Sequence, residues 1–289
     1  MGQHAYGMKA SRPEIVGGAW LHRLAPRRTA ALRLFCFPYA GAAASAFRLW
    51  PASLGDAIEV CAIQLPGRAN RLREPPLTAI PAMVEAAAEA IATFMAEHPD
   101  DPFALFGHSM GGLLAFEVAQ RLKERGHRAP RHLIVSARRA PLTPDASALL
   151  HDLPDDAFVA EIQRRYGGIP EEILAHADVL ALLLPCLRAD ITALETYRPL
   201  RRPPLACPLT VYGGAEDRLV APADLAQWRH ETTGAFDMRV FPGGHFYLDA
   251  RRAEVLADLS ARLVPAHDGI LDDERDSVLD GARQRERVS

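Results

Sequence analysis

Short apolar runs that end at proline or glycine alternate with longer helical patterns, and this alternation restricts the fold more than any other feature. Two runs, Leu32–Phe37 and Glu59–Leu65, are each followed directly by proline. Four more occur at Phe103–Phe106, His132–Ser136, Leu209–Tyr212 and Met238–Phe241. Runs this short without polar alternation are typical of strands buried on both faces of a parallel sheet.

Helical patterns lie between these runs. Within residues 80–97, apolar side chains recur every three or four positions, as one face of a helix requires. Residues 113–125 show a second helical pattern, which Gly126 is suited to end. The repeated alternation predicts an α/β fold, with a mostly parallel central sheet flanked by helices and joined by right-handed crossovers.

One long interval contains no strand pattern. It runs for about 70 residues between Ser136 and Leu209 and contains apolar helical segments at 157–166, 170–174 and 178–196. A gap of this length within a compact domain predicts a helical insertion rather than a loop.

The two ends of the chain differ from its middle. Residues 1–28 carry five Lys or Arg against one Glu and show no sustained periodicity, so we expect a flexible basic lead-in. Residues 265–289 are charged and poor in apolar side chains, which is typical of a disordered tail. The folded domain is therefore expected at residues 29–264.

Composition excludes several classes of protein. Lys and Arg total 33 against 36 Asp and Glu, a balance that argues against a general nucleic-acid binder. No apolar run reaches the roughly 20 residues of a membrane span, and the N-terminus lacks the apolar core of a secretory signal. The four cysteines form no C-x-x-C pair, which favours buried free thiols, and no histidine spacing suggests a metal site. We expect a cytoplasmic monomer that needs no metal or cofactor.

The pentapeptide Gly107-His-Ser-Met-Gly111 lies between a predicted strand and a predicted helix. This is the context in which G-x-S-x-G forms a nucleophile elbow, a sharp and strained turn with the serine at its tip. Glycine at both ends avoids clashes of Cβ atoms with the neighbouring strand and helix. The helix N-terminus directs its free N–H groups toward an oxyanion formed beside Ser109.

The serine needs a base and an acid, and in this fold they follow it in the order acid, then histidine. Asp217 ends the turn after one predicted strand, and His245 ends a Gly-Gly turn after the next strand. We expect Asp217, favoured over the adjacent Glu216, to hold the Nδ1–H of His245, whose Nε2 accepts the proton of Ser109. His108 is expected to point away from Ser109 in a structural role.

An oxyanion hole requires two N–H donors. One should be the N–H of Met110, the residue after the nucleophile, and the other normally comes from the loop after an earlier strand. That loop, at residues 38–45, is rich in small side chains, and Ala40 is the expected donor. The alternative is a turn of small residues with no catalytic part.

Six separated motifs, spread over residues 32–263, resemble the type II thioesterases of polyketide and nonribosomal peptide biosynthesis. They lie at 37–45 (FPYAGAAAS) with Phe47 and Trp50, 65–68 (LPGR), 107–112 (GHSMGG), 184–190 (LPCLRAD) with Glu195 and Tyr197, 213–217 (GGAED) and 243–247 (GGHFY).

This resemblance implies an α/β-hydrolase fold with a helical lid, here at about residues 141–201. It also implies a stand-alone enzyme that hydrolyses acyl thioesters on the phosphopantetheine arms of acyl and peptidyl carrier proteins, clearing misprimed or stalled groups. Its nucleophile, acid and base would be Ser109, Asp217 and His245. Phe47, Trp50 and Tyr197 would be core or pocket-wall residues, with core favoured for each.

The lid and its surroundings carry two further expectations. Its many leucines exceed what one amphipathic face needs, so some could line an acyl tunnel that excludes water. Carrier proteins tend to be acidic, so a basic rim is expected near the entrance. The candidates for this rim are Arg68, Arg71, Arg73, Arg138, Arg139, Arg201 and Arg202.

Three alternatives remain open at this point. A carboxylesterase or lipase would use the same triad on oxygen esters. An integrated releasing or cyclising domain is disfavoured because no carrier domain is attached. A non-catalytic binding protein of the same fold would normally lack a triad member, whereas all three are present; reactivity of Ser109 with a fluorophosphonate would test this.

Overall fold

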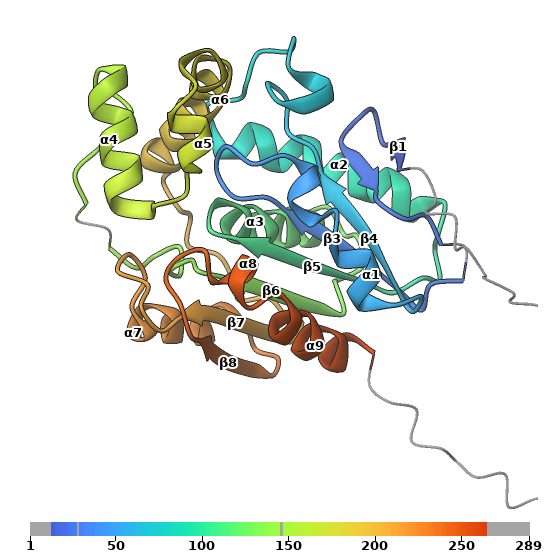
Figure 1. The fold of residues 1–289 in the computed structure, drawn as a ribbon. Coiled ribbons are helices and arrows are strands. Elements are labelled where there is room, and N and C mark those ends of the chain that lie inside the picture. The colour runs from blue at the N-terminus through green and yellow to red at the C-terminus, as the bar shows by residue number, and fades with distance from the viewer. Residues whose placement is uncertain (1–12, 28, 145–146, 265–289) are drawn as a thin grey trace, which may run out of the picture.

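The computed structural model describes residues 13–27, 29–144 and 147–264. At its centre lies an eight-stranded sheet in the order β1-β2-β4-β3-β5-β6-β7-β8 (Figure 1). The strands are β1 (Glu14–Val16), β2 (Leu21–Arg23), β3 (Leu32–Phe37), β4 (Ile58–Ile63), β5 (Phe103–His108), β6 (His132–Ser136), β7 (Leu209–Gly214) and β8 (Phe236–Phe241). Strands β3 to β8 pair in parallel, so all six predicted strands and the predicted fold class are confirmed.

The prediction of a flexible lead-in over residues 1–28 is wrong where the structure describes this segment. Strands β1 and β2 form an antiparallel hairpin, and β2 continues the sheet by pairing with β4. Arg23 Nε lies 2.5 Å from Oε1 of the fully buried Glu59, which further fastens the hairpin. Strands of three residues are too short to show periodicity, which is why they could not be predicted from the sequence. Residues 1–12 and the predicted tail at 265–289 lie outside the described residues.

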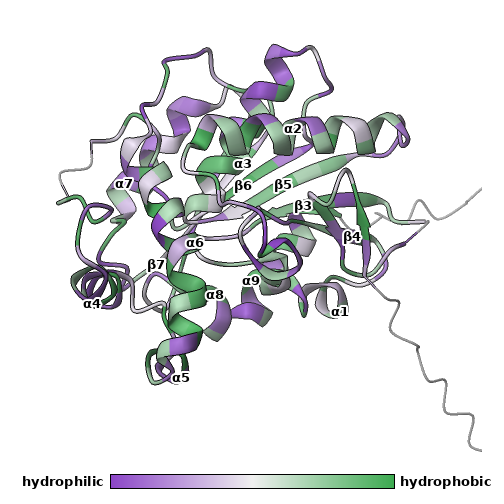
Figure 2. Cartoon of the chain, turned by 90° about the horizontal axis from the view of Figure 1, so that it is seen from above, coloured by the Kyte–Doolittle hydropathy of each residue, from purple (hydrophilic) through white to green (hydrophobic). Residues whose placement is uncertain are grey.

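Helices cover both faces of the sheet. Figure 2 shows α2 (Ile80–Ala96) and α3 (Met110–Glu124) on one side, with α1 (Trp50–Leu54) and α9 (Arg252–Leu263) on the other. Successive side chains of β3 alternate between these faces: Phe35 packs in the cluster with α2 and α3, and Leu34 packs with α1 and α9. This alternation explains why β3 to β7 read as continuous apolar runs, since both of their faces are buried. The prediction of burial on both faces is wrong for β8, which lies at the edge of the sheet and is exposed at residues 237–240.

The predicted helical insertion lies between β6 and β7. It contains α4 (Asp155–Tyr166), α5 (Glu171–Leu174) and α6 (Ala177–Thr196), which stand together over one end of the molecule (Figure 1). Its own small core includes Phe158, Ile162 and Ile191. Helix α4 has Asp155 in its first turn and Arg165 in its last, as its dipole favours, and stops at a left-handed glycine.

The remaining short helices connect these elements. They are the 3₁₀ turns η1 (Ala44–Phe47), η2 (Ala69–Arg71) and η3 (Gln227–Glu231), together with α7 (Pro222–Ala226) and α8 (Tyr247–Ala250).

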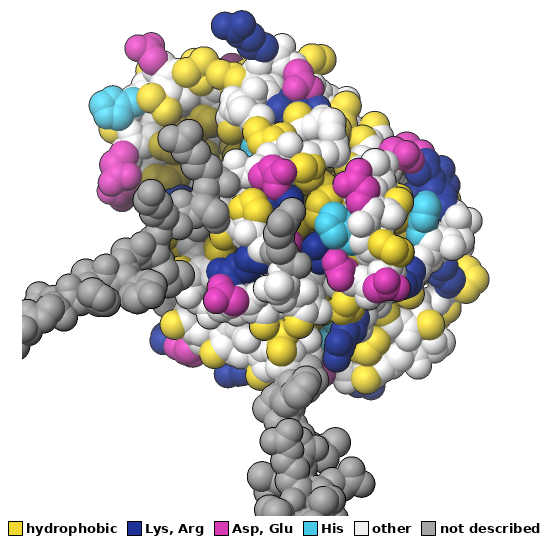
Figure 3. Space-filling model, turned by 90° about the vertical axis from the view of Figure 1, so that its right-hand side faces the viewer, with side chains coloured by type: hydrophobic (Ala, Val, Ile, Leu, Met, Phe, Trp, Pro, Cys, Tyr) yellow, Lys and Arg dark blue, Asp and Glu magenta, His cyan; other side chains and the backbone are white. Residues whose placement is uncertain are grey.

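The four cysteines are buried free thiols, as predicted. On the face shown in Figure 3, basic and acidic side chains are interspersed. Within the described ranges, no helix is both long enough and apolar enough to cross a bilayer.

Candidate active site

Ser109 occupies a strained turn between the end of β5 and the start of α3. Its φ of 54° lies in the left-handed region, which non-glycine residues seldom adopt. A Cβ atom at Gly107 would lie 1.9 Å from the carbonyl oxygen of Gly111, and one at Gly111 would lie 2.0 Å from that of Phe37. Both glycines are therefore required, because they let strand, turn and helix approach closely enough to present the serine.

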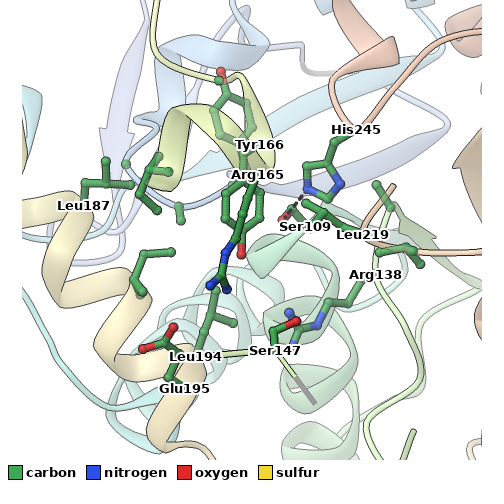
Figure 4. A pocket seen from close by; sticks show the side chains of 18 of the residues that line it. Ser109, Arg138, Ser147, Arg165, Tyr166, Leu187, Leu194, Glu195, Leu219 and His245 are labelled. Atoms are coloured by element: carbon green, nitrogen blue, oxygen red, sulfur yellow. Dashed lines mark hydrogen bonds between the residues drawn. The ribbon is translucent and has the colours of Figure 1, made fainter. Parts of the chain in front are cut away.

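The side chains of Ser109, His245 and Asp217 form one hydrogen-bonded chain. His245 Nε2 lies 2.9 Å from Ser109 Oγ, and His245 Nδ1 lies 2.9 Å from Asp217 Oδ2 (Figure 4). The three residues follow β5, β7 and β8, whose carboxyl ends meet at the same edge of the sheet. With Nδ1–H donated to the carboxylate, Nε2 is left to accept a proton from the serine.

The backbone fixes the carboxylate of Asp217. Its Oδ1 accepts the N–H groups of Leu219 at 2.9 Å and of Val220 at 3.3 Å, which leaves Oδ2 for His245. The neighbouring Glu216 is exposed. Of the two acidic residues considered from the sequence, the structure therefore brings Asp217 to the histidine.

A second buried network of hydrogen bonds lies next to His245 and was not predicted from the sequence. His108 Nδ1 lies 2.8 Å from Ser136 Oγ, which in turn lies 2.5 Å from the hydroxyl of Tyr247. The rings of His108 and His245 are 5.4 Å apart. Burial lowers the pKa of His108 well below its usual value, and the nearby His245 adds to this effect. The sequence offered one sign of this network, because Tyr247 belongs to the motif that contains His245.

The two expected oxyanion donors come from the start of α3 and from the loop after β3. Met110 is the first residue of α3, so its N–H has no partner within the helix. Ala40 follows β3 in a turn that the N–H of Ala42 closes by donating to the carbonyl of Tyr39 at 3.0 Å. Gly41 has a φ of 77°, as the third residue of a type II turn requires. Ala40 and Ser109 both line the same cavity.

That cavity, of about 620 Å³, lies between the sheet edge and the insertion. Ser109 and His245 stand at one side, and Leu187 of α6 faces them across it (Figure 4). Its apolar walls include Leu149, Leu180, Leu183, Leu184, Leu187, Ile191 and Leu194. Polar side chains line another part, namely Arg138, Ser147, Arg165 and Glu195 (Figure 4).

Some leucines of the insertion line the cavity, and others do not. Leu150 is buried in the insertion's own core, and Leu182 is 59% exposed. Tyr197 lines the cavity, although a core position was favoured for it. Phe47 and Trp50 are buried in the core as expected, with ring centres 4.9 Å apart.

The predicted basic rim is wrong for two of its members. Arg68 is buried against Asp190, and Arg71 is buried beside Glu74 with its guanidinium 4.7 Å from the ring centre of Trp20. Charge is visible in a sequence, but the partner that neutralises it is not. The other candidates differ in exposure and in partners. Arg73 and Arg201 are exposed, Arg202 pairs with Glu117, and Arg138 and Arg139 line the cavity.

Among the residues described, no three His, Cys, Asp or Glu side chains gather as a metal site would require.

Comparison with known proteins identifies the family. The family described as "Thioesterase domain" matches residues 32–263 of this chain. The chain belongs to the thioesterase family. The gramicidin S biosynthesis protein GrsT of Aneurinibacillus migulanus is 41% identical over 244 residues, which cover 84% of this chain and 93% of GrsT.

Two solved thioesterases have the same fold. RedJ, from the prodiginine pathway of Streptomyces coelicolor, is 45% identical with a TM-score of 0.74, covering 81% of this chain and 91% of RedJ. The type II thioesterase BorB from the borrelidin cluster is 35% identical with a TM-score of 0.75, covering 83% of this chain and 96% of BorB. The resemblance to type II thioesterases and the α/β-hydrolase fold are thereby confirmed, and the protein is an enzyme that hydrolyses thioesters.

Proposed function

We propose that the protein is an editing thioesterase of a polyketide or nonribosomal peptide assembly line. It removes misprimed or stalled acyl groups from the phosphopantetheine arms of acyl and peptidyl carrier proteins. The observation that carries this proposal is the hydrogen-bonded chain of Ser109, His245 and Asp217, opening onto an apolar cavity beneath a helical insertion. GrsT, RedJ and BorB are each named for the biosynthesis of such a product.

In the first half of the reaction, Ser109 Oγ attacks the thioester carbonyl carbon. His245 Nε2, 2.9 Å from Oγ, accepts the serine proton, and Asp217 stabilises the imidazolium that forms. The negative charge on the carbonyl oxygen is stabilised by the N–H groups of Met110 and Ala40. The carbon–sulfur bond then breaks, and the pantetheine thiol leaves with the proton from His245.

The second half releases the acid. His245 removes a proton from water, the resulting hydroxide attacks the acyl-serine, and Ser109 leaves with that proton. Because the acyl group lies in a cavity walled by leucines of α6, bulk water is kept from the intermediate while its charge develops.

The setting of the reaction follows from the same proposal. The narrow pantetheine arm would enter the cavity while the acidic carrier protein stays outside, and the exposed Arg73 and Arg201 are candidates for contact with that protein. We also propose that the enzyme acts as a monomer in the cytoplasm, a reducing compartment that suits its four buried free thiols.

The test compares the enzyme with its Ser109→Ala variant on acetyl- and longer acyl-carrier proteins, following deacylation by intact mass. The p-nitrophenyl esters of the same acids are assayed in parallel. We expect Ser109-dependent deacylation that is faster than ester cleavage. Rapid ester cleavage with untouched carrier protein would overturn the proposal in favour of a general esterase on oxygen esters.

A further inference from the structure

Asp190 reaches from the insertion into the loop that carries Ala40. It lies on α6, is fully buried, and its Oδ2 accepts the backbone N–H of Gly41 at 2.7 Å. Gly41 directly follows Ala40, the expected oxyanion donor. A side chain of the lid therefore holds the backbone next to the proposed site of charge stabilisation, across 149 positions of sequence.

Arg68, from a third part of the chain, holds Asp190 in place; we call the Asp190–Arg68 pair the anchor of the loop. Its Nη1 and Nη2 donate to the two oxygens of Asp190 at 2.7 and 2.8 Å, and Nη1 also donates to the carbonyl of Ala42 at 3.2 Å. The Arg68 side chain is only 3% exposed. Gln64, the residue directly after β4, accepts the N–H of Ala44 at 3.0 Å. The loop is thus held at three nearby points by buried polar groups.

The turn geometry shows what the anchor controls. In a type II turn the central peptide, here between Ala40 and Gly41, has one orientation, and in a type I turn it is reversed. Reversal would turn the Gly41 N–H away from Asp190 and bring the carbonyl oxygen of Ala40 toward the carboxylate, where like charges repel. Asp190 therefore selects the orientation of the peptide between Ala40 and Gly41. The N–H of Ala40 belongs to the preceding peptide, so Asp190 acts on it through the position of the loop. Leu187, one turn earlier on α6, packs 3.1 Å from where a Cβ of Gly41 would lie.

We propose that Asp190, held by Arg68, is a positioning residue that fixes the oxyanion loop, so that stabilisation of the tetrahedral intermediate requires α6 to be in place. This inference rests on the proposed function, and in particular on Ala40 as a donor. The lid is then part of the catalytic apparatus as well as a wall of the cavity. A buried ion pair is a poor source of stability, because desolvation offsets the attraction, whereas it is well suited to fixing a backbone orientation.

The test is a double variant, Asp190→Leu with Arg68→Met, in which apolar side chains of similar volume replace the ion pair. Replacements of this kind are often neutral or stabilising, so the fold is retained while Gly41 loses its acceptor. Two ligands with the same acyl chain are compared: a boronic acid that forms a tetrahedral adduct with Ser109, and an unreactive thioether analogue of the substrate.

We expect boronate affinity and kcat to fall by about 100-fold, as for loss of an oxyanion donor, with thioether affinity within about 3-fold of wild type. Equal weakening of both ligands would show general loosening of the cavity and overturn the inference, as would no change in either. If the double variant does not fold, Asp190→Asn replaces it. Asparagine keeps the shape of the side chain, but its NH₂ group is a donor and cannot accept a hydrogen bond from the Arg68 guanidinium. The boronate-to-thioether affinity ratio should then fall about 10-fold, and an unchanged ratio overturns the inference.

Glu195→Gln is the matched control. Glu195 lies on the same helix and also accepts backbone N–H groups, those of Leu150 and His151, but it holds no part of the oxyanion loop. Its substitution should move the two affinities together. A wild-type enzyme that neither binds the boronate at Ser109 nor deacylates carrier protein would refute the proposed function itself. A wild type that does both, beside an unchanged double variant, would refute only the role of Asp190.

Discussion

The sheet edge and the helical insertion contribute to the site in different ways. Ser109 directly follows β5, Asp217 and His245 lie in the turns after β7 and β8, and all three are less than 10% exposed. In the insertion, α5 has no buried residue, α4 has two, Phe158 and Ile162, and α6 has five. The reacting groups are thus held at one edge of the central sheet, and two of the three helices that enclose the substrate space have few buried residues.

This difference assigns chemistry to the sheet and substrate choice to the insertion. Changes at the sheet edge should reduce turnover of every substrate by a similar factor. Changes in the insertion should alter which acyl groups are accepted. Asp190 is the described exception, because it lies on the insertion but acts on the backbone beside the sheet.

The largest effect is expected from Ser109→Ala. Removal of the nucleophile should lower kcat by about 10⁴-fold or more for every acyl-carrier protein, with little effect on the melting temperature. Ser147→Ala is the matched control, because Ser147 also lines the cavity but belongs to the insertion. We expect its kcat within about 5-fold of wild type, measured by the same mass assay. Similar losses in both variants would remove the distinction between the two regions.

Asp217→Asn should lower kcat by about 10³- to 10⁴-fold. Because Oδ1 accepts the N–H of Leu219, the asparagine oxygen takes that place and its NH₂ group faces His245 Nδ1. Nδ1 must then accept, which puts the ring proton on Nε2, where it cannot receive the proton of Ser109. The measurement is kcat together with ¹⁵N NMR of the histidine tautomer. Near-normal activity with the proton on Nε2 would show that His245 is not the base.

Leu183→Trp should change selectivity by about 10-fold or more, because the larger side chain fills part of the cavity. We expect kcat/KM to fall for long acyl-carrier proteins and to change little for acetyl-carrier protein. Leu182→Trp is the control, since Leu182 is adjacent in sequence, lies outside the cavity lining and is 59% exposed. A uniform loss over all chain lengths in Leu183→Trp would contradict a role of the insertion in substrate choice.

The smallest effect concerns the stability of the sheet in acid. Burial, with the nearby Arg262 and Arg131, lowers the pKa of His132 to about 4, and its Nε2 lies 2.8 Å from Thr210 Oγ1 on the neighbouring strand. In the unfolded chain the ring protonates near pH 6.5, so the unfolded state binds more protons between about pH 6.5 and 4. Stability should therefore fall as the pH is lowered through this window.

The contribution of His132 to this loss should be about 1–2 kcal/mol, allowing for solvent near the partly exposed ring. Urea denaturation at pH 7 and pH 5 measures it in wild type and in His132→Gln, which cannot titrate. A smaller difference between the two pH values is expected in the variant. An equal difference would show that His132 is not held neutral by the fold.

Much of the fold and the meeting of the three predicted side chains could be predicted because they depend on local patterns. The turn at Ser109 requires glycine at two fixed positions, and Asp217 and His245 each end a turn that directly follows an apolar strand. The hairpin at residues 14–23 could not be predicted, because its strands are too short for periodicity and are stabilised by β4, which is distant in sequence.

The burial of Arg68 could not be predicted for a similar reason. Its motif was visible, but its partner Asp190 is 122 positions away, and only the folded chain shows that the two side chains meet. The same holds for Ser136, whose contact with Tyr247 spans 111 positions. Local chemistry can be inferred from spacing, whereas the contacts that position it depend on the packing of distant segments.

The most direct test of this account is to trap the acyl-enzyme. Enzyme and acyl-carrier protein are mixed, quenched with acid within the first turnover, digested and examined by mass spectrometry. The account predicts that the peptide containing Ser109 carries the mass of the acyl group, and that the adduct decays as free acid appears. Release of acid with no adduct at Ser109, or with the acyl group on another residue, would contradict it.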